Sequence, residues 1–282
     1  MNRQKSFETQ QATLYLVPTP IGNLSEMTKR ALETLENVDI IACEDTRNTS
    51  KLLMAYNIKK PLISHHEHNQ KESIPRILHE LNEGKSVAVV SDAGYPLVSD
   101  PGQKLVCDVI EQGNPVVSLS GCNAAMNALV ASGLSTQHYL FYGFLDSKSS
   151  KRKKQLNELK TFPYTIIFYE APHRISSCLE DILEVFGNRN MCLARELTKL
   201  HEEFIRGTVE EVLSICDSLK GEMVLVIEGN TLKEEVDMND AIDKVNEYVQ
   251  EGYKTKQAIQ LVAKELNIKK NELYDLYHKQ ES

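Results

Sequence analysis

Residues 13–43 read TLYLVPTPIGNLSEMTKRALETLENVDIIAC and contain the pattern that decides the fold. An apolar run, TLYLV, precedes a turn with two prolines, a segment with helical spacing (27–37) and a second apolar run, VDIIAC. The same alternation continues to residue 132, through apolar runs at 61–64, 86–91 and 115–119 and helical segments at 46–56, 72–83, 102–113 and 123–132. Five strands that alternate with five helices predict a mostly parallel sheet with helices on both faces.

A second group of apolar runs follows Gly133. HYLFYGF (138–144), YTIIFYE (164–170) and EMVLVIEG (222–229) alternate with helical segments, and HEEFIRG (201–207) reads as a hairpin or edge strand. We therefore expect a second α/β domain with a mixed sheet. The predicted division is a flexible N-terminal tail (1–12), two α/β domains (13–133 and 134–229), and a linker with a helical appendage (230–282).

The appendage contains three short helical patterns and resembles a helix-turn-helix element. Gly252 ends the first helix and Thr255 is the expected N-cap of the second. From 240 to 282 the segment has seven lysines against eight acidic residues, so its composition does not favour nucleic-acid binding over a packing or dimer role.

Composition and charge limit the function classes. The chain has 282 residues, 41% hydrophobic, and a net charge of −8, which is the wrong sign for a general electrostatic grip on nucleic acid. No apolar run is long enough to span a membrane, and the first 13 residues lack a signal sequence, so a cytoplasmic protein is expected. Six cysteines form no CxxC pair and indicate reduced core thiols. The histidines of HHEHN (65–69) lack regular metal-ligand spacing, so no metal is expected.

Three loops lie where strands of the first domain end. VPTPIGNL (17–24) lacks the glycines of a dinucleotide fold, SDAGYPLVSDPG (91–102) is rich in glycine and proline, and SGCN (120–123) opens a helix of small residues. Each alone is also typical of an ordinary turn or helix start. Open α/β sheets bind ligands at the carboxyl ends of their strands. The convergence of these three loops therefore predicts a ligand site at this edge of the sheet.

Seven segments carry a family resemblance: LYLVPTPIGNLSEMTKRALETL, ACEDTRNTSKLL, SDAGYPLVSDPG, ALVASGL, FYEAPHRI, ARELTKLHEE and KGEMVLVIEG. Together they resemble the tetrapyrrole (corrin/porphyrin) methylases, and within them the bacterial branch that methylates a cytidine 2′-oxygen in the decoding region of small-subunit (16S) ribosomal RNA. The resemblance implies a class III methyltransferase with two α/β domains, a homodimer, and S-adenosylmethionine bound between the domains without a metal. Neither DNA nor a membrane is an expected partner.

The resemblance also implies a set of cofactor-binding residues. From the first domain they are Pro18, Thr19, Tyr95, Leu97, Val98, Asn123 and Ala124, and from the second Tyr169, Glu170, Ala171 and Met223. Many tetrapyrrole methylases have a GDP-like tripeptide where this chain reads Gly94-Tyr95-Pro96, so a phenol replaces a carboxylate at residue 95.

A ribose hydroxyl is weakly acidic, so a positioned base or a nearby cation would assist its methylation. The candidates in ACEDTR and ARELTKLHEE are Glu44, Arg47, Arg195, Lys199 and Glu203. The alternative for each is an ion pair that fixes a loop.

KSSKRKKQLNELK (148–160) is the concentrated basic segment of this acidic chain. Its residues Lys148, Lys151, Arg152, Lys153 and Lys154 are the predicted RNA contacts, although a charge run is also typical of a solvated helix face. Two other functions stay open: methylation of a tetrapyrrole or other small molecule, and a non-catalytic ribosome-binding protein. The EDTR, APHRI and ARELTK motifs and the helical tail favour RNA as the acceptor.

Overall fold

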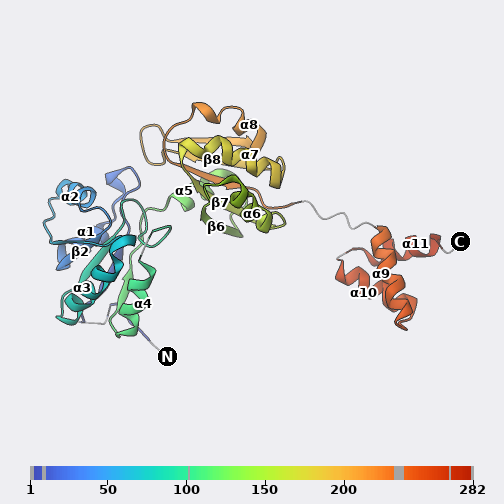
Figure 1. Cartoon of the computed structure of the whole chain (residues 1–282), viewed down its shortest axis with the longest axis horizontal. Helices are drawn as coiled ribbons and strands as arrows, with labels where there is room; N and C mark the ends of the chain where they lie inside the picture. Colours follow the sequence, from blue (N-terminus) through green and yellow to red (C-terminus); the bar gives the residue numbers. More distant parts are fainter. Residues whose placement is uncertain (1–2, 8–10, 101, 232–237, 267, 281–282) are drawn as a thin grey trace. The chain divides into compact units, whose positions relative to one another are not determined.

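Five parallel strands form the first sheet, in the order β3-β2-β4-β1-β5. They are β1 (Leu14–Val17), β2 (Ile40–Cys43), β3 (Leu62–Ser64), β4 (Val87–Val90) and β5 (Val116–Ser118). The structure is a computed structural model that describes residues 3–7, 11–100, 102–231, 238–266 and 268–280. Every strand pair in this sheet is parallel, which confirms the predicted arrangement. The sheet lies in the blue to green part of the ribbon in Figure 1.

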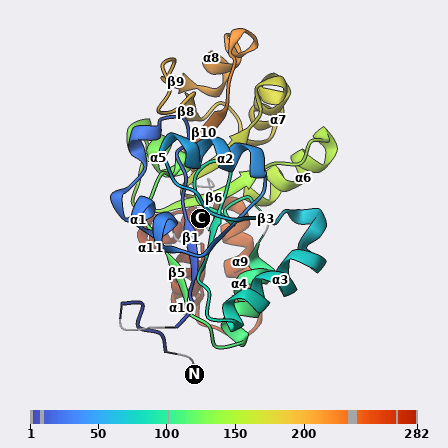
Figure 2. The same cartoon turned by 90° about the vertical axis from the view of Figure 1, so that its left-hand side faces the viewer.

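Alternating side chains of these strands face two helical layers. In β2, Ile41 and Cys43 belong to the core beneath α1 (Lys29–Asn37) and α2 (Thr46–Ala55). Ile40 and Ala42 belong to the core beneath α3 (Gln70–Asn82) and α4 (Gln103–Glu111). Short 3-10 helices, η1 (Leu24–Glu26) and η2 (Glu67–Asn69), precede α1 and α3. Because strand side chains alternate between faces, each strand contributes to both cores, and Figure 2 shows α1 and α3 on opposite sides of β1.

The second sheet has the order β6-β7-β10-β8-β9 and is mixed, as predicted. β6 and β7 are parallel, whereas β10 runs antiparallel to β7 and β8, and β9 is an antiparallel edge strand on β8. The strands are β6 (Tyr139–Phe144), β7 (Thr165–Glu170), β8 (Asn190–Arg195), β9 (Glu203–Thr208) and β10 (Met223–Ile227). The helices between them are α6 (Ser149–Leu159), η3 (Pro172–Arg174), α7 (Ile175–Phe186), α8 (Val209–Leu213) and η4 (Cys216–Ser218).

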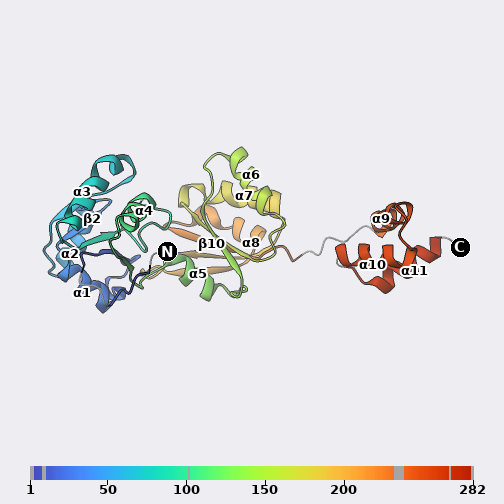
Figure 3. The same ribbon diagram turned by 90° about the horizontal axis from the view of Figure 1, so that it is seen from below.

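Helix α5 (Ala124–Ser132) connects the two sheets. The sequence division assigns it to the first domain, but its buried residues Ala125, Ala128 and Leu129 pack against Val224 and Val226 of β10. This helix covers the face of the second sheet opposite α6 and α7 (Figure 3). The carboxyl edge of the first sheet is thereby joined directly to the second sheet.

The described residues form two compact units, one ending at Asn230 and one beginning at Thr231. In the second, α9 (Met238–Gln250), α10 (Thr255–Glu265) and α11 (Lys270–Gln280) share a core that includes Ile242, Ile259 and Leu273. α10 begins at Thr255 with Lys254 as N-cap, so the predicted Thr255 cap is wrong by one residue. Residues 1, 2 and 8–10 of the predicted tail and 232–237 of the predicted linker lie outside the described residues.

Candidate active site

Hydrogen bonds join the three loops that follow β1, β4 and β5. Thr19 and Gly94 exchange two backbone hydrogen bonds of 2.9 and 3.0 Å, and the Thr19 hydroxyl donates to the Ser91 carbonyl at 3.1 Å. The backbone N–H of Gly121 donates to the Tyr95 hydroxyl at 3.0 Å. The three loops thus form one bonded surface at the carboxyl edge of the first sheet.

This surface depends on unusual backbone geometry. A Cβ atom on Gly121 would lie 2.6 Å from Pro18 Cβ, so only glycine fits against the proline turn. Leu97 and Ser99 have φ angles of 72° and 65°, in the left-handed region that non-glycine residues rarely adopt. Such strain of about 1 to 3 kcal/mol per residue concentrates at ligand sites. The 91–102 loop is therefore held in a specialised conformation.

The opposite wall comes from the second sheet, where β7 ends and β10 begins. Met223 is the register partner of Glu170 at this end of the sheet. Tyr169 lies between two other aromatic rings, with centroid distances of 5.0 Å to Phe141 and 5.5 Å to Phe144. These edge-to-face contacts fix the position of the Tyr169 ring.

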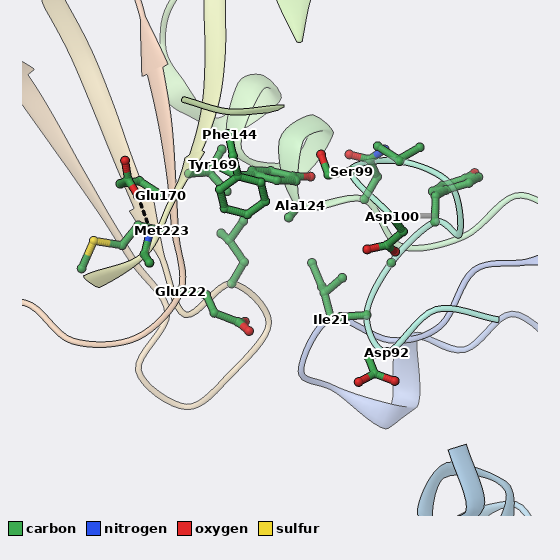
Figure 4. A pocket seen from close by; sticks show the side chains of 18 of the residues that line it. Ile21, Asp92, Ser99, Asp100, Ala124, Phe144, Tyr169, Glu170, Glu222 and Met223 are labelled. Atoms are coloured by element: carbon green, nitrogen blue, oxygen red, sulfur yellow. Dashed lines mark hydrogen bonds between the residues drawn. The ribbon is translucent and has the colours of Figure 1, made fainter. Parts of the chain in front are cut away.

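A cavity of about 380 Å³ lies between the two walls, within the size range of small-molecule sites. Figure 4 shows Tyr169 and Phe144 between Met223 and Glu170 on one side and Ser99 and Asp100 on the other. The lining residues are Ile21, Asp92, Ala93, Gly94, Tyr95, Val98, Ser99, Asp100, Asn123, Ala124, Phe144, Tyr169, Glu170, Ala171, Pro172, Leu197, Glu222, Met223 and Val224.

Eight of the eleven residues expected at the cofactor line this cavity: Tyr95, Val98, Asn123, Ala124, Tyr169, Glu170, Ala171 and Met223. The structure does not place the other three in its lining. Pro18 packs against Gly121, Leu97 lies beneath Gly102, and Thr19 lines a neighbouring cavity. Pro18 and Thr19 therefore shape the loop surface from behind.

Four carboxyl groups line the cavity, and the pKa of one of them, Asp100, is raised. Burial, and then the negative charges of Glu44 and Asp92, raise the pKa of Asp100 from 3.8 to about 6. Burial raises the pKa of Tyr169, and the charge of the partly buried Asp100 nearby raises it further. A carboxylate with a pKa near the working pH is suited to accept a proton.

Two other lining carboxyl groups are held by cations. Glu170 is 3% exposed, accepts the Ala171 N–H at 2.8 Å and lies 3.2 Å from the Arg174 guanidinium. Glu222 pairs with Lys199 Nζ at 3.0 Å. Their positions are fixed by the chain itself, which leaves Asp92 and Asp100 as the acidic groups at the first wall.

Arg47 and Glu44, the candidate catalytic residues from ACEDTR, have different surroundings. Arg47 forms a two-point hydrogen bond with Asp45 at 3.1 and 2.7 Å, lowers the pKa of Asp45 to about 2, and is 85% exposed. Glu44 is exposed and acts on Asp100 through its charge. Neither side chain lines the described cavity.

The predicted residues from ARELTKLHEE brace loops. Arg195 on β8 pairs with Glu203 on β9 at 2.5 Å, and Arg195 also donates to the Lys220 carbonyl at 3.0 Å. Lys199 bonds Glu196 at 3.0 Å, and its side chain occupies the space beside Gly22. Of the described residues that line the cavity, none is Arg195, Lys199 or Glu203, so a catalytic role for them stays a prediction.

The basic segment needs one correction. Arg152 was expected to contact RNA, but it is 2% exposed and pairs with Asp181 of α7 at 2.6 Å. Its guanidinium also donates to the Ser177 carbonyl at 3.0 Å. Arg152 is thus a buried structural residue, because it lies on the same helix face as buried Leu156. Lys148, Lys151 and Lys154 are exposed, whereas Lys153 pairs with Glu184 and Asp181.

Sequence reasoning missed several cavity residues. Asp100 is not among the cofactor-binding or catalytic residues named from the sequence, although its place in a loop that follows a parallel strand is a usable signal. Ile21, Leu197 and Glu222 lie in quoted motif segments but were not named as cofactor residues, and Phe144 lies outside these segments. The packing of α5 on the second sheet helps to bring these segments together.

The histidine-rich segment has a structural explanation. Buried His65 bonds the Ser73 hydroxyl at 2.8 Å, and burial lowers the pKa of its ring. In the part of the chain that the structure describes, no group of three His, Cys, Asp or Glu residues could hold a metal ion. None of the described helices is both long and apolar enough to cross a bilayer.

Comparisons with known proteins agree with this architecture. The family model "Tetrapyrrole (Corrin/Porphyrin) Methylases" matches residues 13–213. The protein named ribosomal RNA small subunit methyltransferase I of Bacillus subtilis (strain 168) is 47% identical, with 99% of each chain covered. Its namesake in Halalkalibacterium halodurans is 44% identical over 99% of this chain and 100% of that protein. A solved structure of diphthine synthase is similar in fold, with a TM-score of 0.62, 14% identity, and coverage of 78% of this chain and 91% of that one.

The family match covers well over half of the chain, and the relatives extend along almost all of it. These relatives are methyltransferases, and the methyltransferases of this family use S-adenosylmethionine as the methyl donor. The chain therefore belongs to the tetrapyrrole methylase family and is an S-adenosylmethionine-dependent methyltransferase.

Proposed function

We propose that this enzyme methylates the ribose 2′-oxygen of a cytidine in the decoding region of 16S ribosomal RNA. The observation that carries the acceptor class is the near-complete coverage of relatives named for the small-subunit ribosomal RNA, at 47% and 44% identity. Cytidine and its 2′-oxygen rest on the motif resemblance. We place this activity in the cytoplasm, where ribosomal subunits are available.

The cavity fits the donor in size and charge. S-adenosylmethionine carries a positive sulfonium and a positive amino group, and the cavity contributes Asp92, Asp100, Glu170 and Glu222. None of the described residues in the lining is a lysine or arginine. The aromatic faces of Tyr169 and Phe144 also favour a cation. Apolar side chains such as Ile21, Leu197 and Met223 complete the lining and are suited to pack against the adenine ring.

When bound, S-adenosylmethionine supplies a methyl group on a sulfonium that is already a good leaving group. The protein mainly has to orient the acceptor, exclude water and accept its proton. Asp100 is the group suited to hold that proton, since it lines the cavity and its pKa is raised to about 6. Glu44 and Asp92 act on it by charge.

The exposed lysines Lys148, Lys151 and Lys154 at α6 are the proposed phosphate contacts. Their combined replacement by alanine is expected to weaken RNA binding, measured by filter binding across salt concentrations. Each lost contact should reduce the slope of log affinity against log salt by about 0.7 to 0.9. The dissociation constant of S-adenosylmethionine should not change.

A matched control removes three other exposed lysines, Lys29, Lys59 and Lys85. It changes the net charge equally and should leave most of the RNA affinity intact. Equal losses in both triple variants would contradict the local contact.

We also propose a homodimer. Apolar side chains are exposed at Val130 on α5 and at Tyr139 on the edge strand β6, a surface suited to be covered by a second copy. A monomer mass by light scattering at micromolar concentration would contradict this proposal.

The test of the proposed function offers three acceptors together with labelled S-adenosylmethionine. These are unmethylated small subunits, naked 16S ribosomal RNA and a porphyrin precursor. Label in the ribosomal RNA is the expected result. Label on the porphyrin would favour a small-molecule methyltransferase. The absence of any transfer, with donor affinity in the millimolar range or weaker, would favour a non-catalytic ribosome-binding protein.

A further inference from the structure

A second cavity of about 290 Å³ adjoins the cavity proposed to bind S-adenosylmethionine, called the donor cavity below. Asp92 lines both. The other walls of the second cavity come from the segment after β1, residues 48–52 of α2, and Ser91 directly after β4. In Figure 4 the Asp92 carboxylate lies at the edge of the donor cavity and points away from Tyr169. The two cavities are thus neighbouring compartments with one shared acidic residue.

The second cavity contains a paired donor and acceptor. Asn48 Nδ2 donates to Asp92 Oδ2 at 2.8 Å, and both side chains are exposed to an incoming ligand. The amide has a second N–H, and the carboxylate has a second oxygen with lone pairs. Side by side, the pair presents one donor and one acceptor to the cavity.

This pattern matches the pairing edge of cytosine. Cytosine offers an amino donor at N4 beside an acceptor at N3, and carboxylates are suitable acceptors for the N4 amino group. Uracil presents the reverse order, an acceptor at O4 and a donor at N3, so its O4 would face the Asp92 carboxylate. Once the base covers these two side chains, such a mismatch costs more than a lost hydrogen bond.

We propose that the second cavity binds the cytosine base of the acceptor nucleotide. Asp92 accepts a hydrogen bond from the N4 amino group and Asn48 donates to N3. This inference rests on the proposed function and assigns its base specificity to these two residues. Exposed Lys51 in the same lining is suited to the phosphate of that nucleotide.

Asp92 also determines where the bound base lies relative to the donor cavity. Because Asp92 lines both cavities, a base bound at this residue lies next to the donor cavity. Asp100 lines the donor cavity and lies close enough to Asp92 for the two charges to interact. The acceptor nucleotide would have to leave its stack to reach this position, as in other enzymes that modify nucleotides.

The test exchanges the two groups. The double variant N48D/D92N keeps the volume, the net charge and the mutual hydrogen bond, but reverses the order of donor and acceptor. The single variants N48D and D92N are made in parallel. Each protein is assayed on small subunits with cytidine or uridine at the methylated position, with the donor at saturation for that variant.

The wild type is expected to prefer cytidine by roughly tenfold or more in kcat/KM, as one bidentate base contact provides. The double variant should prefer uridine by a similar factor, and each single variant should discriminate less than the wild type. A folded double variant that keeps the cytidine preference, or that is inactive with both acceptors, overturns the assignment while wild-type methylation of the RNA upholds the proposed function. A wild type that methylates no ribosomal RNA overturns both.

Discussion

Replacement of Asp100 by asparagine should lower the rate of methyl transfer by about 10² to 10⁴-fold, the usual contribution of a positioned general base. The amide has nearly the same shape but accepts no proton. Single-turnover transfer of labelled methyl to small subunits measures the rate. The affinity for S-adenosylmethionine, measured by calorimetry, should change much less, because the other lining residues remain.

The pH dependence of the same reaction provides a second test of Asp100 as the base. Because the base acts in its ionised form, the wild-type rate should rise with pH and level off above about pH 6, the raised pKa of Asp100. The groups that face it are Glu44, Asp92 and Tyr169. The D100N variant should lose this rise. Asp108→Asn, which changes a surface carboxyl on α4, is the matched control. A D100N enzyme with the wild-type rate and pH profile would exclude Asp100 as the base.

Asp100 should also affect stability, with a definite sign. Its pKa is raised in the folded protein from 3.8 to about 6, so its contribution is fully present below pH 3.8 and is lost as the pH rises through 6. At pH 7 the ionised carboxylate therefore destabilises the fold. After allowance for solvent screening, D100N should raise the free energy of unfolding at pH 7 by on the order of 1 kcal/mol. Lower activity with higher stability is typical of active-site residues.

Arg152→Ala should lower the free energy of unfolding by about 3 kcal/mol, because it removes the buried partner of the Asp181 carboxylate. Asp181 then keeps only the Ser149 hydroxyl at 2.9 Å and Lys153 at 3.5 Å. The Arg152 and Asp181 side chains are 2% and 8% exposed. Urea unfolding followed by circular dichroism measures the effect. Exposed Lys154→Ala on the same helix should change stability by less than about 0.5 kcal/mol.

A double variant separates charge from packing. Arg152→Met combined with Asp181→Leu removes both buried charges and should recover most of the stability lost in Arg152→Ala. Its RNA affinity should equal that of the wild type. If Arg152→Ala instead weakens RNA binding without loss of stability, then Arg152 faces RNA and its buried assignment is wrong.

The parts of the fold that the sequence predicts are those set by local pattern. The apolar run VDIIAC places Ile41 on one face and Ile40 on the other, so a strand buried on both faces was expected and is found. The turn at Pro18 and the 91–102 loop follow the parallel strands β1 and β4, and the carboxyl ends of parallel strands meet at one edge of the sheet. This is why most of the cofactor residues named from motifs share one cavity.

Other features depend on contacts between distant residues. The basic run around Arg152 gives no sign that Asp181, 29 residues later, neutralises it inside the core. Small residues such as Ala125 and Ala128 suit either sheet, so the sequence could not show which one α5 covers. The raised pKa of Asp100 arises first from burial and then from the charges of Glu44 and Asp92. Glu44 follows β2 and comes near the loop after β4 only when these strands pair.

The most direct test of the central claim is the chemical identity of the methylated nucleoside. Small subunits methylated by this enzyme are digested to nucleosides and analysed by mass spectrometry against standards. The account predicts 2′-O-methylcytidine as the product, from the RNA of the small subunit. A cytidine methylated on its base, or a methyl group on another nucleoside, would contradict it.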